Sequence, residues 1–213
     1  MNKKLITLIF LSIIFIGYTS AQDARAILDK ASESYAGSGV ITVKFSLDAK
    51  DLKANQTFSQ DGTAYMKGNK FKIELPEAVT WFDGKTQWTY LKNTEEVNIT
   101  NPTGDELQAI SPSVLFSIYK KGFDLKYKGV KNVRGKMVQE IEMTAQDKKT
   151  ELKKIIVEIN KSSGTFSKIV LYDANGMENT LTVTGYKSNQ PLGEEVFAFN
   201  KKDYPEAEIV DLR

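Results

Sequence analysis

The side chains that could carry out acid–base chemistry gather along one aromatic stretch, Trp81 to Pro102. Asp83, Glu95 and Glu96 flank Trp88 there, and two carboxyl groups beside a tryptophan that stacks on a sugar ring would suit a glycosidase. All three acids stand at chain reversals, however, where Asp beside Gly and polar residues between strands have a sufficient structural explanation. A secreted carbohydrate-active enzyme is therefore the less favoured function.

Two residue types that dominate enzyme chemistry are missing, since the 213-residue chain contains no histidine and no cysteine. Without histidine the commonest general base and the commonest metal ligand are lost. Without cysteine there is no disulfide, no thiolate metal site and no Cys nucleophile, and no cysteine that could carry a lipid. We therefore expect a protein that is not an enzyme, with no catalytic residue, no metal site and no cofactor.

The N-terminus has the three parts of a secretory signal peptide. Lys3 and Lys4 precede an apolar run over 5–16, and the small residues Thr19-Ser20-Ala21 follow it. An apolar run of about a dozen residues is too short to span a bilayer comfortably. We expect cleavage after Ala21, so that residues 1–21 are a signal peptide and the protein is free in the periplasm.

Charge and composition describe what remains after cleavage, residues 22–213. Removal of the leader takes away two lysines and no acid, so Lys+Arg falls from 29 to 27 against 27 Asp+Glu. A nearly neutral chain gives no support for a nucleic-acid partner. The full chain has 41% hydrophobic and 26% charged residues and no linker or internal repeat, so residues 22–213 are expected to be one domain and a monomer.

Helical spacing predicts an amphipathic helix over roughly 24–35, in which Asp23 is a candidate N-cap. The period then changes to two, which is typical of half-buried strands. Turn signals such as Asp83-Gly84 and Asn175-Gly176 separate the alternating runs. About eleven strands are predicted, over 41–48, 55–67, 70–75, 81–82, 87–90, 97–99, 123–128, 137–145, 152–160, 166–172 and 178–186.

A second, short helix is predicted over 112–121. Ser111-Pro112 provides an N-cap followed by proline at the first helical position, and Lys120-Lys121-Gly122 provides a basic last turn and a terminating glycine. The residues between these signals are apolar around most of the helix circumference, so this helix must be covered.

So large an antiparallel sheet curls, because strand twist accumulates and open sheets beyond roughly ten strands seldom stay flat. With two or three helices to cover its apolar face, the simplest architecture is a half-open barrel with helices laid across its mouth and an apolar cavity inside. Trp88 and Tyr90 fall two apart and share a face of their strand. They belong either to an ordinary core or to a pocket wall, and the shortage of covering helices favours the wall.

Lysine-rich pieces alternate with apolar residues or occupy loops, so most of them form the solvated sides of strands. A docking role stays open for some of these groups, which are Lys67, Lys70 and Lys72; Lys126, Lys128 and Lys131; and Lys148, Lys149, Lys153 and Lys154.

The order of these parts resembles the periplasmic outer-membrane lipoprotein carrier family (LolA-like). Shared features are a signal peptide, an N-terminal amphipathic helix, strands, Asn101-Pro102, a Ser-Pro-led apolar helix, and further strands to a C-terminal Ile209-Val210-Asp211. The most specific piece is the run DGKTQWTY over 83–90, which matches the family's D-G-K-T-x-W-x-Y hairpin. The resemblance covers nearly all of the chain after the leader.

This resemblance implies an unclosed β-barrel with an α-helical lid, and a carrier rather than an enzyme. Such proteins accept acylated lipoproteins from an ATP-driven (ABC) exporter in the inner membrane and deliver them to an acceptor at the outer membrane. The expected cavity is lined by Leu28, Phe45, Phe58, Phe71, Ile73, Trp88 and Tyr90. The expected lid residues are Ile27, Val114, Leu115, Phe116 and Ile118.

One departure from the family concerns the latch of the lid. Many members place an arginine just after the second strand, where it bonds to the lid backbone, and this chain has Gly68 there. Lys67 or Lys70 could substitute, although lysine lacks the planar fork of arginine. A related alternative function is a periplasmic sensor on the same fold, which binds a lipoprotein or a misfolded chain to regulate a membrane-bound partner.

Overall fold

A computed structural model describes residues 15–103, 106 and 112–213, without the side chains of 15–20 and of Leu115. Within these residues one twelve-stranded sheet has the order β12-β6-β5-β4-β3-β2-β1-β11-β10-β9-β8-β7. Its strands are β1 (Val40–Asp51), β2 (Gln56–Lys67), β3 (Lys70–Glu74), β4 (Ala78–Phe82), β5 (Gln87–Leu91), β6 (Glu96–Thr100), β7 (Phe123–Val133), β8 (Lys136–Ala145), β9 (Leu152–Asn160), β10 (Phe166–Asp173), β11 (Met177–Gln190) and β12 (Glu208–Asp211).

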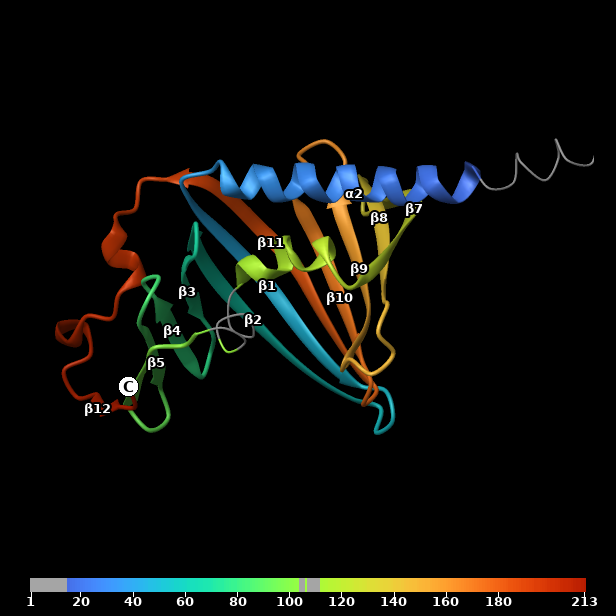
Figure 1. Ribbon diagram of the computed structural model, residues 1–213. Coiled ribbons are helices and arrows are strands. Elements are labelled where there is room, and N and C mark those ends of the chain that lie inside the picture. Colours follow the sequence, from blue (N-terminus) through green and yellow to red (C-terminus); the bar gives the residue numbers. More distant parts are fainter. Residues whose placement is uncertain (1–14, 104–105, 107–111) are drawn as a thin grey trace, which may run out of the picture.

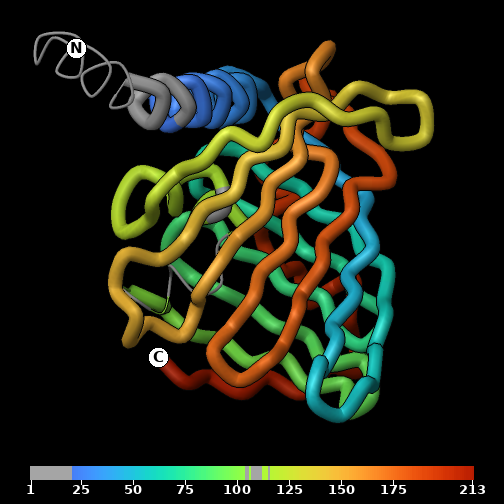
Figure 2. Tube along the Cα trace, turned by 90° about the vertical axis from the view of Figure 1, so that its right-hand side faces the viewer, coloured from blue at the N-terminus to red at the C-terminus, as the bar shows by residue number. Residues whose placement is uncertain are grey.

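The sheet curls but does not close, because β7 and β12 are its two edges and do not pair with each other. Figures 1 and 2 show the resulting half-barrel, with the long helix α2 (Phe15–Ala36) lying across one end of the strands. The predicted half-open barrel of antiparallel strands with helices over its mouth is confirmed.

Helix α2 confirms the predicted helix over 24–35 and begins earlier, at Phe15. Its buried stripe consists of Ala24, Leu28, Ala31 and Tyr35, at spacings of four, three and four. Burial of Leu28, which is 1% exposed, contributes roughly 2–3 kcal/mol. In the part of the chain that the structure describes, no helix is both long and apolar enough to cross a bilayer. The cleavage after Ala21 stays a prediction.

The predicted helix over 112–121 is instead two 3-10 turns, η1 (Pro112–Phe116) and η2 (Ile118–Lys120). The amide of Ser117 bonds to the carbonyl of Val114, and the amide of Lys120 bonds to the carbonyl of Ser117, which is the i to i−3 pattern. A segment this short gains little from the cooperativity of a longer α-helix. We call η1 and η2 together the lid.

The inner face of the sheet carries the main hydrophobic core. The pairs Ile41 with Met66, and Met66 with Phe71, bring apolar side chains of β1, β2 and β3 onto this face. On the other half of the sheet, Ile141 pairs with Val157. The buried stripe of α2 joins the same core, together with Tyr119 of the lid.

The outer face carries a second, smaller core over β4, β5 and β6. Its members are Val97, Ile99 and Ala207, with Trp88, Tyr90, Phe199 and Tyr204 packed against them. Residues 191–207, which we call the C-terminal segment, cover this core and contain two further 3-10 turns, η3 (Glu194–Phe197) and η4 (Lys201–Asp203).

The chain ends on the far edge of the sheet, where β12 lies parallel to β6. This twelfth strand was not predicted, because it has four residues and Ile209 and Val210 are adjacent and do not alternate with polar residues. Its position depends on the covering segment just before it, in which Ala207 is buried.

Candidate functional site

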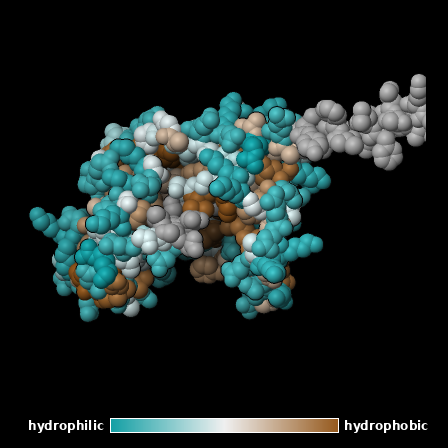
Figure 3. Space-filling model, viewed as in Figure 1, coloured by the Kyte–Doolittle hydropathy of each residue, from teal (hydrophilic) through white to brown (hydrophobic). Residues whose placement is uncertain are grey.

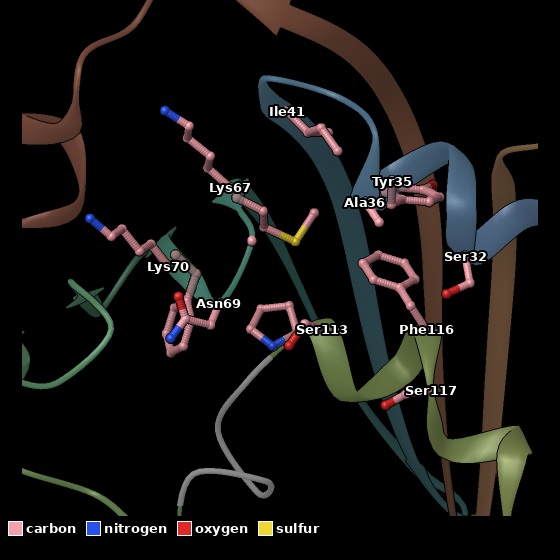
Figure 4. A pocket seen from close by; sticks show the side chains of 14 residues that line it. Ser32, Tyr35, Ala36, Ile41, Lys67, Asn69, Lys70, Ser113, Phe116 and Ser117 are labelled. Carbon is pink, nitrogen blue, oxygen red and sulfur yellow. The ribbon is translucent and has the colours of Figure 1, made fainter.

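A pocket of about 300 Å³ opens between α2, the lid and the β2–β3 hairpin. Figure 4 shows its residues converging from these three places. Its apolar lining includes Ile41, Met66 and Phe71 from the sheet, with Tyr35 of α2 and Phe116 of η1. Polar lining residues are Ser32, Lys67, Asn69, Lys70, Ser113 and Ser117. The pocket is therefore lined by both apolar and polar side chains.

Aromatic stacking holds η1 against α2. The rings of Phe116 and Tyr35 lie 4.1 Å apart between centroids at an interplanar angle of 21°, and Phe166 of β10 packs beside both. The hydroxyl of Tyr35 accepts a hydrogen bond of 3.2 Å from the Phe166 amide. Burial raises the pKa of Tyr35, and the hydrogen bond from the amide works in the opposite direction. Tyr35 is therefore a neutral part of the wall.

A hydrogen bond ties η2 to α2. The Tyr119 hydroxyl donates to a carboxylate oxygen of Asp29 at 2.6 Å, and Tyr119 is 1% exposed. Burial, and next the hydrogen bond to Asp29, raises the pKa of Tyr119 to about 12. This hydrogen bond is stronger than one between two neutral groups, because its acceptor is a charged carboxylate.

The two lysines at the mouth of the pocket face away from it. Lys67 and Lys70 each bond to one carboxylate oxygen of Glu194, at 2.5 and 2.7 Å, and in Figure 4 both side chains extend away from the pocket. Hydrogen bonds from Lys67 and Lys70 lower the pKa of Glu194 to about 2. The interpretation that either lysine replaces the family arginine at the lid is thus wrong in this structure, because both hold the C-terminal segment.

Gly68 itself lies between these lysines in the turn from β2 to β3. Its φ of +59° is the left-handed conformation, and no atom lies within 4 Å of where a Cβ would stand. The lid is therefore latched without a side chain at this position, through Tyr35 and Tyr119.

The inner face continues beyond the pocket as a hollow. Figure 3 shows hydrophobic residues lining a depression below α2. Several side chains on this part of the face are only half-buried, so other core side chains do not cover them completely. They are Leu47, Ile73, Leu171, Leu181 and Val183. We call this surface the inner hollow.

Most of the predicted cavity residues lie on the inner face. Leu28 and Phe71 belong to the main core, and Ile73 packs against it. Phe45 is buried and lies over Gly62, where an added Cβ would stand 2.5 Å from its ring. Phe58 pairs with Ala49 at the far end of the same face and is 62% exposed.

Trp88 and Tyr90 require a correction, because they lie on the outer face. Phe71 pairs with Phe82, and Phe82 pairs with Gln87, so these three side chains share the inner face. Trp88 follows Gln87 and points the other way, as strand alternation demands. Tyr90 packs on Tyr204, with ring centroids 4.7 Å apart. The predicted aromatic wall is therefore the core beneath the C-terminal segment.

Three of the predicted lid residues pack against the main core. Ile27, Phe116 and Ile118 pack half-buried against the main core, and Val114 is half-buried. The side chain of Leu115 lies outside the described residues.

Sequence reasoning did not assign Tyr35, Met66 or Tyr119 to the site. Tyr35 was visible as the last member of the helical stripe, and Met66 lies on the same side of its strand as Ala64. Tyr119 had no comparable signal, because its partner Asp29 is 90 residues away.

The three acids considered for glycoside hydrolysis do not come together. Asp83 accepts hydrogen bonds of 2.8 Å from the amides of Lys85 and Thr86, which stabilises its own turn. Glu95 and Glu96 lie at the other end of β5, a strand of five residues that spans about 17 Å. Paired carboxyl groups of glycosidases stand about 5–9.5 Å apart. Among the described residues, no three acidic side chains gather as a metal site either.

An unclosed antiparallel half-barrel, with a helix across its end and a lid over an apolar pocket, defines the class of this protein. The chain belongs to the family of the outer membrane lipoprotein carrier protein LolA, whose model matches residues 15–175.

Two solved structures show the same fold. An uncharacterized conserved protein from Thermus thermophilus is 16% identical, with a TM-score of 0.60 over 89% of this chain and 99% of that one. LprF from Mycobacterium bovis is 13% identical, with a TM-score of 0.50 over 82% of this chain and 96% of that one. The search of curated protein sequences gave no significant match.

Proposed function

We propose that the protein is a periplasmic carrier that holds the acyl chains of lipoproteins on its inner face. It would be exported through cleavage of residues 1–21, accept its cargo from a lipoprotein-releasing ABC transporter in the inner membrane, and pass it to an acceptor at the outer membrane. The observation that carries this proposal is the inner hollow, an apolar surface that the core leaves partly open beneath a lid. Membership of the lipoprotein carrier family supports it.

The energy of an acyl chain explains why such a surface is needed. At roughly 0.8 kcal/mol per methylene, a chain of about sixteen carbons is worth on the order of 12 kcal/mol of burial. A protein that diffuses through water must therefore cover the chain with apolar side chains. Neither the pocket nor the hollow needs a titratable group for this task.

The size of the pocket supports the proposal that the lid moves. A volume of about 300 Å³ is at the lower end of ligand cavities, which span roughly 300–1,000 Å³. A long acyl chain must extend from the pocket along the inner hollow toward Phe58. Displacement of Phe116 from Tyr35 would join the pocket to the hollow in one surface.

A charge placed in the hollow tests this proposal. Phe58→Asp should weaken saturable uptake of a fluorescent fatty acyl probe by about ten-fold or more, because an acyl chain bound at this position would have to desolvate the carboxylate. It should leave the free energy of unfolding nearly unchanged, since the Phe58 side chain is 62% exposed. Uptake is measured by titration with the purified protein.

The matched control is Leu192→Asp, which changes the charge equally at a 40% exposed apolar residue of the C-terminal segment. Equal loss of uptake in both variants, or no uptake by the parent protein, would contradict the proposal. Extraction of the protein from the envelope should also bring acylated lipoproteins with it.

A further inference from the structure

A basic, partly apolar protrusion lies at one end of the half-barrel, apart from the pocket. It consists of the β7–β8 hairpin over 129–137 and the β9–β10 turn over 161–164, which we call the basic tip. The Lys161 amide donates a 2.9 Å hydrogen bond to the Met137 carbonyl, so the two loops lie side by side. Figure 2 shows the hairpin, in yellow, extending beyond the rest of the sheet.

The basic tip contains four cations and no acid, namely Lys131, Arg134, Lys136 and Lys161. Lys131 is neutralised from the strands behind it by Glu140 and by Glu158, the latter at 2.9 Å. The other three are exposed and form no ion pair with any residue that the structure describes. The tip therefore presents a net positive charge to its surroundings.

The basic tip also carries two exposed apolar side chains, on one face of the hairpin. Val130 is 39% and Met137 is 48% exposed. Val130 pairs with Gln139 and Met137 pairs with Asn132, so both apolar side chains fall on the face of the hairpin that also carries Gln139. Lys131 pairs with Val138 and Lys136 pairs with Val133, so these two lysines project from the opposite face. A protrusion that carries exposed apolar side chains together with cations is typical of surfaces that enter the headgroup region of a membrane.

The hairpin is held in one shape. Arg134 and Gly135 have φ of +50° and +82°, which is the two-residue turn that matches the twist of paired strands. The amide of Gly135 also donates to the side-chain oxygen of Asn132 at 2.9 Å. Little conformational entropy would be lost when such a loop docks.

A cleft of about 320 Å³ adjoins the tip. It lies between α2 and the β9–β10 turn, with Lys30 and Lys161 among its lining residues together with Ile27, Gln139 and Ser162. Two cations beside this cleft offer charge-assisted hydrogen bonds to a phosphate headgroup next to the inserted apolar side chains.

We propose that the basic tip docks the protein onto a membrane surface that contains anionic phospholipid. A membrane rather than a protein partner is favoured because the tip is a narrow protrusion, whereas stable protein interfaces bury well over about 1,000 Å². Charge complementarity supplies attraction, and Val130 and Met137 supply shallow insertion. This site is separate from the inner hollow and goes beyond the carrier function.

Vesicle binding by charge variants tests the proposal. The probe is vesicles of phosphatidylcholine with 30 mol% phosphatidylglycerol, about the composition of a strongly anionic surface. Each cation contributes roughly five-fold near such a surface, so Arg134→Gln/Lys136→Gln/Lys161→Gln should bind about 100-fold more weakly. Binding is measured by co-sedimentation. The protein is purified from the periplasm, and its processed N-terminus is determined by mass spectrometry.

The matched control is Lys85→Gln/Lys148→Gln/Lys149→Gln, which removes the same charge at exposed positions away from the tip. It should bind within about two-fold of the parent. An equal loss in both triple variants would overturn the proposal in favour of unspecific electrostatics. Retention of binding by the tip variant would overturn it as well, as would equal binding to pure phosphatidylcholine.

Insertion is measured directly, because the chain has no cysteine of its own. Met137→Cys carrying an environment-sensitive fluorophore should shift its emission to the blue on anionic vesicles, and the same label on Lys149→Cys should not. No shift at Met137 would overturn insertion. The triple variant of the tip should still take up the acyl probe, so loss of vesicle binding and loss of carriage remain separate results.

Discussion

Two tyrosines connect the lid to α2 in different ways. Tyr35 contributes a ring face that stacks on Phe116, whereas Tyr119 contributes a hydroxyl that donates to Asp29. The first contact is apolar and insensitive to pH below the range in which phenols ionise. The second depends on one proton, so it can be tested by titration.

Tyr119→Phe removes this hydrogen bond and should lower the free energy of unfolding by about 1–2 kcal/mol at pH 8. Tyr119 has a pKa of about 12 when folded against 10.0 ordinarily. Its contribution is therefore complete below pH 10 and is lost as pH rises toward 12. The difference between parent and variant in denaturant unfolding should shrink over that interval.

Both proteins contain the same other tyrosines, so the difference between them isolates Tyr119. Asp29→Asn keeps an acceptor for the hydroxyl and should cost less than Tyr119→Phe. A double variant that loses no more than Tyr119→Phe alone would show that the two side chains act as one pair. A difference that stays constant to pH 12 would exclude this role for the Tyr119 proton.

At the scale of elements, the C-terminal segment is attached at three points. Glu194 bonds to the lysines of the β2–β3 hairpin, Phe197 is fully buried, and Tyr204 packs edge-on against Trp81. The aromatic contacts fix the segment on the outer face, and the ion pairs fix its entry near the mouth of the pocket.

Glu194→Gln should loosen this entry without unfolding the protein, because exposed ion pairs contribute little. Amide hydrogen exchange over 194–197 should become roughly two- to five-fold faster at pH 7. The folded pKa of Glu194 is about 2 against 4.5 ordinarily. Its contribution is therefore present above pH 4.5 and is lost as pH falls toward 2.

Glu195→Gln is the matched control, since Glu195 is exposed and forms no ion pair with the residues that the structure describes. It should leave the exchange rates over 194–197 unchanged at pH 7. If the parent and Glu194→Gln exchanged at the same rate at pH 7, the ion pairs would have no part in holding the segment.

The strands were predictable because their signal is local. Alternation of Ile41, Val43 and Phe45 with polar residues identifies a half-buried strand, and Asp83-Gly84 identifies the turn before β5. Which face is inner was not predictable from alternation. Trp88 and Tyr90 were correctly placed together, but their side of the sheet depends on Phe199 and Tyr204, more than a hundred residues away.

The candidate site was likewise predictable only in part. Leu28 and Phe71 were placed by family resemblance and lie in the main core. The stacking of Phe116 on Tyr35 combines two segments about 80 residues apart, and no local pattern specifies it. The exposed position of Phe58 depends on how far β1 and β2 extend beyond α2, which strand periodicity does not report.

At the scale of the whole molecule, the open sheet separates three surfaces. The inner hollow lies between the two halves of the half-barrel, the C-terminal segment covers the outer face of one half, and the basic tip projects from the other half. The lid covers the inner hollow, and its contacts with α2 include the stacking of Phe116 on Tyr35 and the hydrogen bond from Tyr119 to Asp29. We expect movement of the lid to enlarge the cavity.

A cross-link that prevents this movement should block carriage. Ala36 of α2 and Ser117 of the lid both line the pocket and face it in Figure 4, and the absence of native cysteine allows Ala36→Cys/Ser117→Cys to be joined by a cleavable bismaleimide. Uptake of the fatty acyl probe should be about ten-fold slower in the joined form, as for other gated sites. Cleavage of the linker should restore it, whereas each single cysteine variant treated identically should bind normally. Unchanged uptake by the joined protein would mean that the acyl chain enters along the inner hollow without displacement of the lid.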